Sequence, residues 1–182
     1  MNTFKIHDLA SAPEETKASL ENSLKSFGMI PNLHGVLAEA PKVLEAYKVL
    51  SGLFQDSSFD NDELTVVWQT INVENECHYC VPAHTAIGHM MKVDAGLIDA
   101  LRNGGAMPND KLQALHDTTL SIVRNRGNIS EEELQSFYAA GYGKQQVLEI
   151  ILGLSQKVIS NYSNHIAKTA VDEPFQKFAW SK

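Results

Sequence analysis

The sequence has very few cysteines, and this scarcity limits the kinds of protein that it can encode. Only 2 of its 182 residues are cysteine, and they lie three positions apart, at Cys77 and Cys80. A small secreted protein that depends on disulfides carries more cysteines at wider spacings. A single C-x-x-C motif instead indicates redox chemistry or metal binding.

The sequence also lacks the features of proteins that bind membranes or nucleic acids. Its formal net charge is −7 and it contains no basic run, so we expect neither a nucleic-acid partner nor attachment to an anionic membrane. No apolar run is long enough to span a bilayer. The residues from Met1 to Lys5 lack the apolar stretch of a signal peptide, so we expect a cytoplasmic protein.

Apolar residues recur at helical spacing along almost the whole chain, and no useful stretch alternates as a strand does. Asp60 and Glu63 form the pattern of a capping box, and Pro41 is a further helix start. No linker rich in glycine or serine divides the chain. We predict one all-α domain over residues 1–182 with about eight helices and a motif-bearing core at about residues 40–125.

The segment that ends at His84 combines both cysteines with a histidine. On one helix, Cys77, Cys80 and His84 would occupy positions i, i+3 and i+7, within about 60° of one another. The Cα atoms of the two cysteines would lie about 5 Å apart, which a disulfide tolerates. His84 follows Cys80 by one turn, where an imidazole can exchange a proton with the thiol.

Pro82 restricts where this helix begins. Because proline lacks an N–H, it is tolerated mainly in the first turn of a helix. The helix therefore either begins near Cys77 to Tyr79 or is kinked at Pro82. In the first case Cys80 lies beside unpaired backbone N–H groups, which stabilise a thiolate.

Other interpretations of the two cysteines stay open. A free cysteine is often only a small buried hydrophobic residue, although two of them in C-x-x-C before a histidine favour a redox role. Four soft zinc ligands are close in sequence, at Cys77, Cys80, His84 and His89. Structural zinc sites normally take their second ligand pair from a separate element. A thioredoxin-like domain places its C-x-x-C after a strand, and no strand is predicted here.

The segment Glu74-Asn75-x-Cys77-x-x-Cys80-x-x-x-His84 resembles the motif of the alkylhydroperoxidase D family, within the carboxymuconolactone decarboxylase superfamily. The resemblance extends over nearly the whole chain. Residues 27–41 look like the N-terminal part of a peroxidase-related branch of this family, and residues 141–162 look like its C-terminal part.

This resemblance implies an all-α fold that assembles into trimers or hexamers and reduces peroxides without a metal, haem, flavin or other cofactor. By analogy, Cys80 attacks the peroxide as a thiolate, Cys77 resolves the sulfenic acid to a disulfide, and His84 carries protons. Glu74 is a further candidate catalytic residue. An external dithiol, such as a dihydrolipoyl group or a thioredoxin-like protein, would restore the thiols.

The sequence departs from the family pattern at the carboxylate of the proton relay. Better-studied members carry a glutamate twelve residues before the first cysteine, where this chain has Thr65. Gln69 shares the face of Thr65 on the expected helix but does not titrate. Glu74 and Glu149 are candidate replacements, and burial of Glu149 among apolar neighbours would raise its pKa. The alternative for Glu149 is a position on a solvated helix face or in a structural ion pair.

Three functions are compatible with the sequence. The first is a thiol-dependent peroxidase that reduces alkyl or hydrogen peroxide. The second is a non-catalytic redox sensor or partner-binding module that uses the same disulfide. The third is an enzyme of the carboxymuconolactone decarboxylase type, whose chemistry does not need a C-x-x-C. The intact cysteine pair argues against the third function, and we favour the peroxidase because the family resemblance implies it.

Overall fold

The computed structural model describes residues 4–182, and all regular structure in that part of the chain is helical. Its elements are α1 (Glu14–Phe27), α2 (Asn32–Leu37), α3 (Pro41–Gln55), α4 (Asn61–Glu74), α5 (Cys80–Met90), α6 (Ala95–Asn103), α7 (Asp110–Arg124), α8 (Glu131–Ala139), α9 (Lys144–Ala167) and the 3-10 helix η1 (Glu173–Phe178). The all-α prediction is confirmed. All of these α-helices except α2 have nine or more residues, which agrees with the predicted number.

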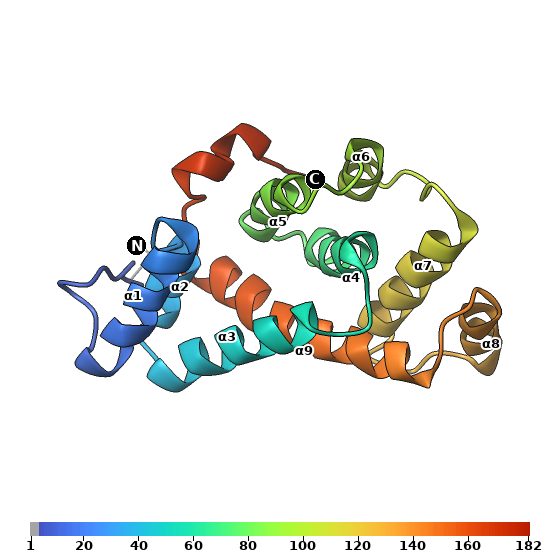
Figure 1. Cartoon of the computed structure of the whole chain (residues 1–182), viewed down its shortest axis with the longest axis horizontal. Helices are drawn as coiled ribbons and strands as arrows, with labels where there is room; N and C mark the ends of the chain where they lie inside the picture. The colour runs from blue at the N-terminus through green and yellow to red at the C-terminus, as the bar shows by residue number, and fades with distance from the viewer. Residues whose placement is uncertain (1–3) are drawn as a thin grey trace.

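Helix α4 lies at the centre of the molecule (Figure 1). Its residues 63–72 are all buried, and it packs against α5, α6, α7 and α9. A helix that is covered on every side is apolar all round or bonds its polar groups internally. Val67 and Ile71 supply apolar faces of α4, whereas Gln69 and Asn72 belong to a buried polar network.

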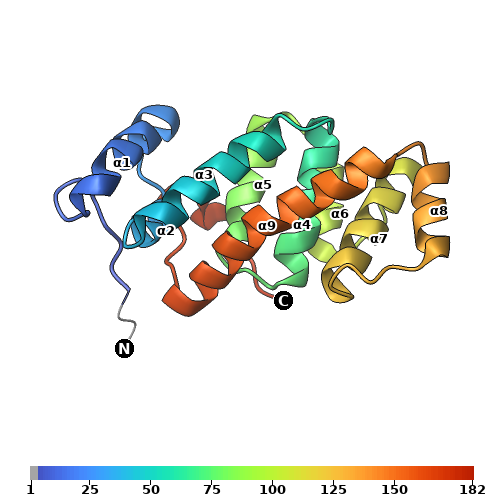
Figure 2. The ribbon, with the colours of Figure 1, turned by 90° about the horizontal axis from the view of Figure 1, so that it is seen from below.

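Helices α3 and α9 lie side by side, and α9 crosses most of the molecule (Figure 2). One hydrophobic cluster fills the space between α4, α6, α7, α8 and α9. A second cluster joins α1, α2 and α3 to the C-x-x-C segment, and it includes Cys77 and Cys80. The two cysteines therefore lie inside the fold, between the N-terminal helices and α9.

Local capping signals place most helix ends where the sequence predicts them. Asp60 accepts a hydrogen bond from the Glu63 N–H at 2.9 Å, and the Glu63 carboxylate accepts one from the Asp60 N–H at 3.0 Å. Pro41 starts α3, as predicted. The short helix α2 was not predicted, because the Asp172 carboxylate, 140 residues away in sequence, accepts a hydrogen bond from its Asn32 N–H.

Among residues 4–182, no helix has both the length and the hydropathy to cross a membrane.

Candidate active site

The turn that ends α4 positions Cys77. The Cys77 N–H donates to the Asn72 carbonyl at 2.9 Å, and the Glu76 N–H donates to the Val73 carbonyl at 3.0 Å. These two bonds form a Schellman motif, which places the residue before Cys77 in the left-handed region. Here that residue is Glu76, with φ of 51°. The chain therefore reverses sharply at Glu76 and directs Cys77 into the protein, where it is fully buried.

Helix α5 begins at Cys80, so Cys77 precedes this helix. The prediction of one continuous helix through both cysteines is therefore wrong, and the alternative based on Pro82 is confirmed, because Pro82 lies in the first turn of α5. The Cys80 N–H donates to Cys77 Sγ at 3.3 Å. The Val81 N–H donates to the Cys77 carbonyl at 3.1 Å. The turn thus holds the two sulfur atoms against each other.

The surroundings of the two thiols make them unequal. Burial alone would raise the pKa of Cys80, but a hydrogen bond from the Cys77 thiol, the positive charge of Lys157 and the side chains of Asn164 and Ser160 outweigh it and lower that pKa. The Asn164 Nδ2 donates to Cys80 Sγ at 3.3 Å. The pKa of Cys77 is raised, because its thiol donates to Cys80 and because it is buried. Cys80 is therefore the thiolate and Cys77 the thiol.

Lys157 of α9 is the cationic partner of Cys80 and is only 1% exposed. Burial lowers the pKa of Lys157, and the negative charge of the cysteines offsets part of that shift. Its Nζ lies 2.7 Å from Nε2 of His84. Burial, together with the positive charge of Lys157, holds the pKa of His84 well below its usual value, so the imidazole is neutral and Nε2 accepts from the ammonium group. The His84 ring also lies against Trp68, with ring centroids 4.9 Å apart. Both contacts fix His84 beside Lys157.

A polar stripe on α9 faces α4 and the cysteines. Its residues, at most 1% exposed, are Gln156, Lys157, Ser160, Asn161 and Asn164. The stripe joins α4, because Asn161 Nδ2 donates to Asn72 at 3.0 Å and Trp68 Nε1 donates to Gln156 at 2.9 Å. A buried polar stripe of this kind is stable only when most of its polar groups have hydrogen-bond partners, and here α4 and α5 supply most of them.

Lys157 was not expected at this site from the sequence. Lys157 follows His84 by 73 residues, and nothing local to either residue predicts their contact. A signal did exist in the sequence, because polar side chains (two kinds of amide, a lysine and a serine) recur at positions 156, 157, 160, 161 and 164. That spacing of three and four places them on one face of a helix whose other residues are largely apolar.

The structure does not bring the predicted catalytic residue Glu74 to the cysteines. Its carboxylate accepts two hydrogen bonds from the Arg124 guanidinium group, at 2.8 and 2.9 Å. Thr65, at the position of the family glutamate, is also not a proton carrier, and its hydroxyl donates to the Asn61 carbonyl at 2.8 Å. The buried titratable side chains beside the cysteines are His84 and Lys157 instead.

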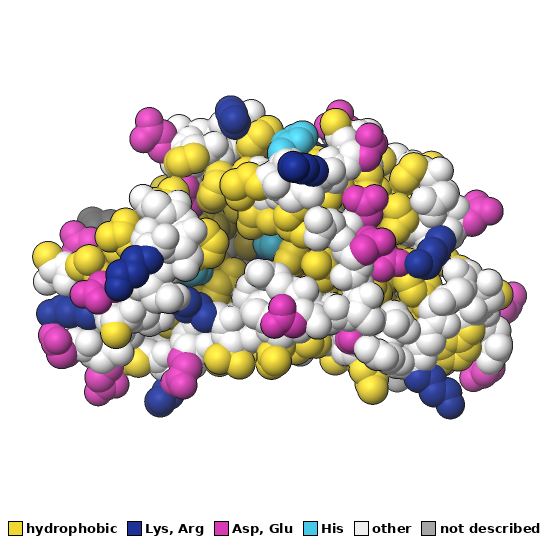
Figure 3. Space-filling view, in the orientation of Figure 1, with side chains coloured by type: hydrophobic (Ala, Val, Ile, Leu, Met, Phe, Trp, Pro, Cys, Tyr) yellow, Lys and Arg dark blue, Asp and Glu magenta, His cyan; other side chains and the backbone are white. Residues whose placement is uncertain are grey.

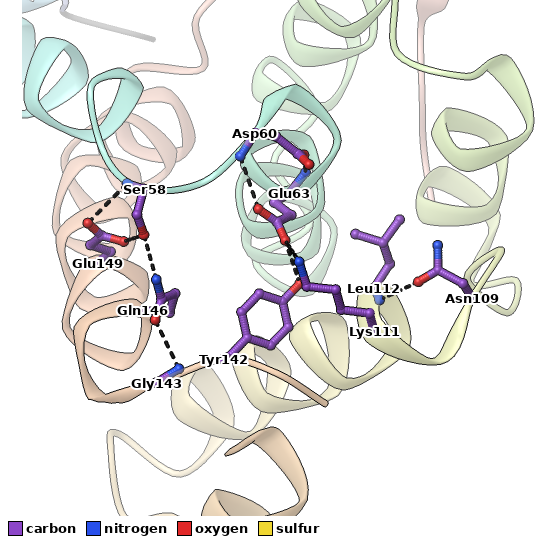
Figure 4. A network of polar contacts seen from close by, with 10 residues as sticks. All are labelled: Ser58, Asp60, Glu63, Asn109, Lys111, Leu112, Tyr142, Gly143, Gln146 and Glu149. Atoms are coloured by element: carbon purple, nitrogen blue, oxygen red, sulfur yellow. Dashed lines mark hydrogen bonds and ion pairs between the residues drawn. The ribbon is translucent and has the colours of Figure 1, made fainter. Parts of the chain in front are cut away.

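Glu149 belongs to a polar network at the other end of α4 (Figure 4). It accepts from the Ser58 N–H at 3.1 Å and from Gln145 at 3.0 Å. In the same view the Glu63 carboxylate accepts from the Tyr142 hydroxyl at 3.0 Å and pairs with Lys111 at 2.8 Å. Glu149 therefore bonds neutral side chains away from the cysteines, so it neither replaces the family glutamate nor forms the ion pair of the alternative interpretation.

The four proposed zinc ligands do not converge. The ring of His89 is stacked on Phe178, with centroids 5.4 Å apart, and His84 is bound to Lys157. In the part of the chain that the structure describes, no group of three or more His, Cys, Asp or Glu side chains is arranged to hold a metal ion.

The two residues between the cysteines bind the C-terminal segment. His78 Nε2 lies 2.9 Å from the Thr169 carbonyl. The Tyr79 hydroxyl donates to Asp172 and accepts from the Leu33 N–H at 3.2 Å. Beyond this point η1 packs on α5. The C-x-x-C turn is thus clamped between α2 and the C-terminal segment.

The cysteines lie below the surface, since Cys80 is 2% exposed and Cys77 is not exposed at all. The molecular face in Figure 3 is hollowed between α2 and α5, and hydrophobic side chains dominate the walls of this hollow. Helix α5 begins with Cys80 and carries His84, so the hollow lies beside the helix that bears both residues.

The geometry can be compared with solved structures. A peroxidase-related protein from Ralstonia eutropha JMP134, described as an alkylhydroperoxidase AhpD core, superposes with a TM-score of 0.84 at 18% identity, over 94% of this chain and 93% of the other. The fold is that of the alkylhydroperoxidase core. A peroxidase-related protein from Silicibacter sp. TM1040 has a TM-score of 0.81 at 19% identity, over 95% and 94% of the two chains. Identities this low establish the shared fold alone.

The same fold also occurs in an enzyme of another activity. The debrominase Bmp8, solved with 2,3,4-tribromopyrrole, has a TM-score of 0.80 at 12% identity, over 97% of this chain and 95% of the other. No protein-family model and no curated protein sequence matches the chain. The fold therefore agrees with the resemblance of the C-x-x-C segment to the alkylhydroperoxidase D family. Because the same fold serves more than one activity, it does not by itself identify the reaction.

Proposed function

We propose that this protein is a thiol-dependent peroxidase in which Cys80 reduces a hydroperoxide and Cys77 closes the disulfide. The observation that carries the proposal is the arrangement around the buried Cys80 sulfur, which accepts from the Asn164 amide and lies beside the Cys77 thiol, while the charge of Lys157 helps to lower the pKa of Cys80. A reactive cysteine needs a lowered pKa and a nearby cation. A cysteine that is only part of a hydrophobic core needs neither.

The first step transfers one oxygen atom. The Cys80 thiolate attacks the hydroxyl-bearing oxygen of ROOH, the O–O bond breaks, and Cys80 becomes a sulfenic acid while alkoxide leaves. The Lys157 ammonium group gives its proton to that alkoxide, so the products are ROH and a neutral amine. His84, whose Nε2 accepts from Lys157, is a positioning residue that orients the ammonium group for this transfer.

The second step removes that oxygen as water. The neutral amine of Lys157 takes the proton from the Cys77 thiol, and the Cys77 thiolate attacks the sulfenic sulfur of Cys80. The S–O bond breaks as the S–S bond forms, and the hydroxide that leaves takes the proton back from Lys157. An external dithiol, such as a dihydrolipoyl group or a thioredoxin-like protein, then reduces the disulfide, and ionisation of Cys80 restores the charge of Lys157.

A redox sensor is the second candidate, because one observation favours it. His78 and Tyr79 lie between the cysteines and bind the C-terminal segment at Thr169 and Asp172, so closure of the disulfide acts directly on that segment. The number of chains in the assembly stays a prediction from the family resemblance.

The test measures turnover of cumene hydroperoxide by the wild type with dihydrolipoamide as reductant. Cys80→Ser should abolish turnover, and Cys77→Ser should accumulate a sulfenic acid that a dimedone-type reagent labels on Cys80. His89→Ala, a substitution outside the cysteine group, should retain full turnover. Equal peroxide consumption by the wild type and Cys80→Ser would refute the peroxidase function. If the wild type forms the disulfide but does not turn over peroxide, the redox sensor becomes the favoured function.

A further inference from the structure

The side-chain amide of Asn164 lies in the cysteine site, where its nitrogen makes a hydrogen bond and its oxygen makes none. Its Nδ2 donates to Cys80 Sγ at 3.3 Å. Its Oδ1 is buried and, alone among the buried side-chain amide oxygens of residues 4–182, has no hydrogen-bond partner. Because a thiolate offers only lone pairs, the amide nitrogen has to face it, and Oδ1 is the atom that is left over.

Simple geometry places this free oxygen near the nucleophile. The nitrogen and oxygen of an amide group are about 2.2 Å apart, so Oδ1 lies within about 5.5 Å of Cys80 Sγ. An oxygen atom of a substrate can therefore lie about 3 Å from both Asn164 Oδ1 and Cys80 Sγ, which is the position that a reacting oxygen requires. Buried acceptors are almost always bonded, and one without a partner beside a nucleophile indicates a ligand that donates.

We propose that Asn164 Oδ1 recognises the O–H group of the peroxide and thereby selects peroxides that keep an O–H, ROOH with R either carbon or hydrogen, over dialkyl peroxides. The oxygen that carries this hydrogen is the one that sulfur attacks, so the hydrogen bond holds the transferred oxygen against Cys80. After the O–O bond breaks, the same bond holds the hydroxyl of the sulfenic acid while Cys77 attacks. This inference rests on the proposed peroxidase function.

Lys157 and Asn164 then have separate tasks at one sulfur atom. Lys157 stabilises the thiolate and donates a proton to the departing alkoxide. Asn164 holds the thiolate through Nδ2 and the peroxide through Oδ1. Peroxides without an O–H, in which both oxygens carry carbon, make no bond to Oδ1 and are excluded.

The experiment compares two reagents that consume the Cys80 thiolate. Methyl methanethiolsulfonate has no hydrogen-bond donor, so its rate reports only how much thiolate is present. The rate with cumene hydroperoxide reports the thiolate and, in addition, the bond to Oδ1. For Asn164→Leu, which keeps the side-chain volume, the hydroperoxide rate should fall about five- to tenfold more than the methanethiolsulfonate rate.

Ser160→Ala is the matched control, because it removes a second group that stabilises the Cys80 thiolate and leaves the amide oxygen in place. In this variant both rates should fall by the same factor. Asn164→Ser gives a second test if Asn164→Leu fails to fold, and the extra loss with hydroperoxide should recur in it.

The outcomes separate the inference from the function on which it rests. If the two rates fall equally in the Asn164 variants, Oδ1 does not hold the peroxide and the inference is wrong while the peroxidase stands. If the wild type consumes no hydroperoxide, the proposed function is wrong and the inference falls with it.

Discussion

Replacing Lys157 by methionine removes the cation beside Cys80 and keeps a side chain of similar length in the core. The positive charge of Lys157 lowers the pKa of Cys80. An opposite charge next to a titratable group shifts the pKa of that group by about one to three units. The thiolate fraction of the variant, at pH values below both pKa values, should therefore be about 10- to 1000-fold smaller than in the wild type. Above the pKa of the variant the two fractions converge.

The assay is the rate of alkylation by iodoacetamide between pH 4 and pH 10 in about half-unit steps. We expect the midpoint of the Lys157→Met profile to move upward by about one to three pH units, with equal plateau rates at high pH. Lys48→Met is the control, because Lys48 is a partly buried lysine whose ammonium group bonds α1 at Ser19 and Asn22. Identical midpoints in the wild type and Lys157→Met would refute the assignment of Lys157 as the partner of the thiolate.

Three further substitutions test other parts of the structure. Hydrogen bonds from Lys111 and Tyr142 overcome burial and hold the pKa of Glu63 below its ordinary 4.5, so their stabilisation is complete above pH 4.5 and fades below it. Glu63→Gln should therefore lower the free energy of urea unfolding by about 1–2 kcal/mol at pH 7, with a difference that shrinks toward pH 3; a difference independent of pH contradicts this. Glu76→Gly should raise the unfolding temperature, because glycine adopts the left-handed turn without the cost of about 1–2 kcal/mol that other residues incur; a lower unfolding temperature contradicts the turn. Tyr79→Phe removes one of the two hydrogen bonds to the Asp172 carboxylate and leaves the one from the Asn32 N–H. Limited proteolysis should therefore cut the segment after residue 168 faster than in the wild type, and unchanged cleavage would show that the Tyr79 bond does not hold the segment.

Local sequence signals predict the fold well because they act within a few residues. The Asp60 capping box and the proline at Pro82 each fix a helix start with atoms from the same turn. Helix α2 escaped prediction, since it is only six residues long and its N-terminus is bonded by Asp172. No local pattern reports a partner that far along the chain.

The candidate site was predicted in part for the same reason. The two cysteines and His84 lie within eight residues of one another, so their proximity follows from the turn and helix that carry them. Glu74 is equally near in sequence, but the end of α4 directs it to Arg124. Sequence distance therefore predicts contact only when the direction of the backbone between the residues is known.

The attachment of the C-terminal segment affects how the protein can be handled. Trp180 Nε1 donates to the Arg102 carbonyl at 3.0 Å, and the Lys182 ammonium group lies 3.4 Å from Glu76, the residue directly before Cys77. Any polypeptide joined after Lys182, such as an affinity tag or a fluorescent fusion, is therefore tethered next to the dithiol. Activity measured on such a fusion would include the effect of its own linker, and a tag joined before the first residue avoids this attachment point.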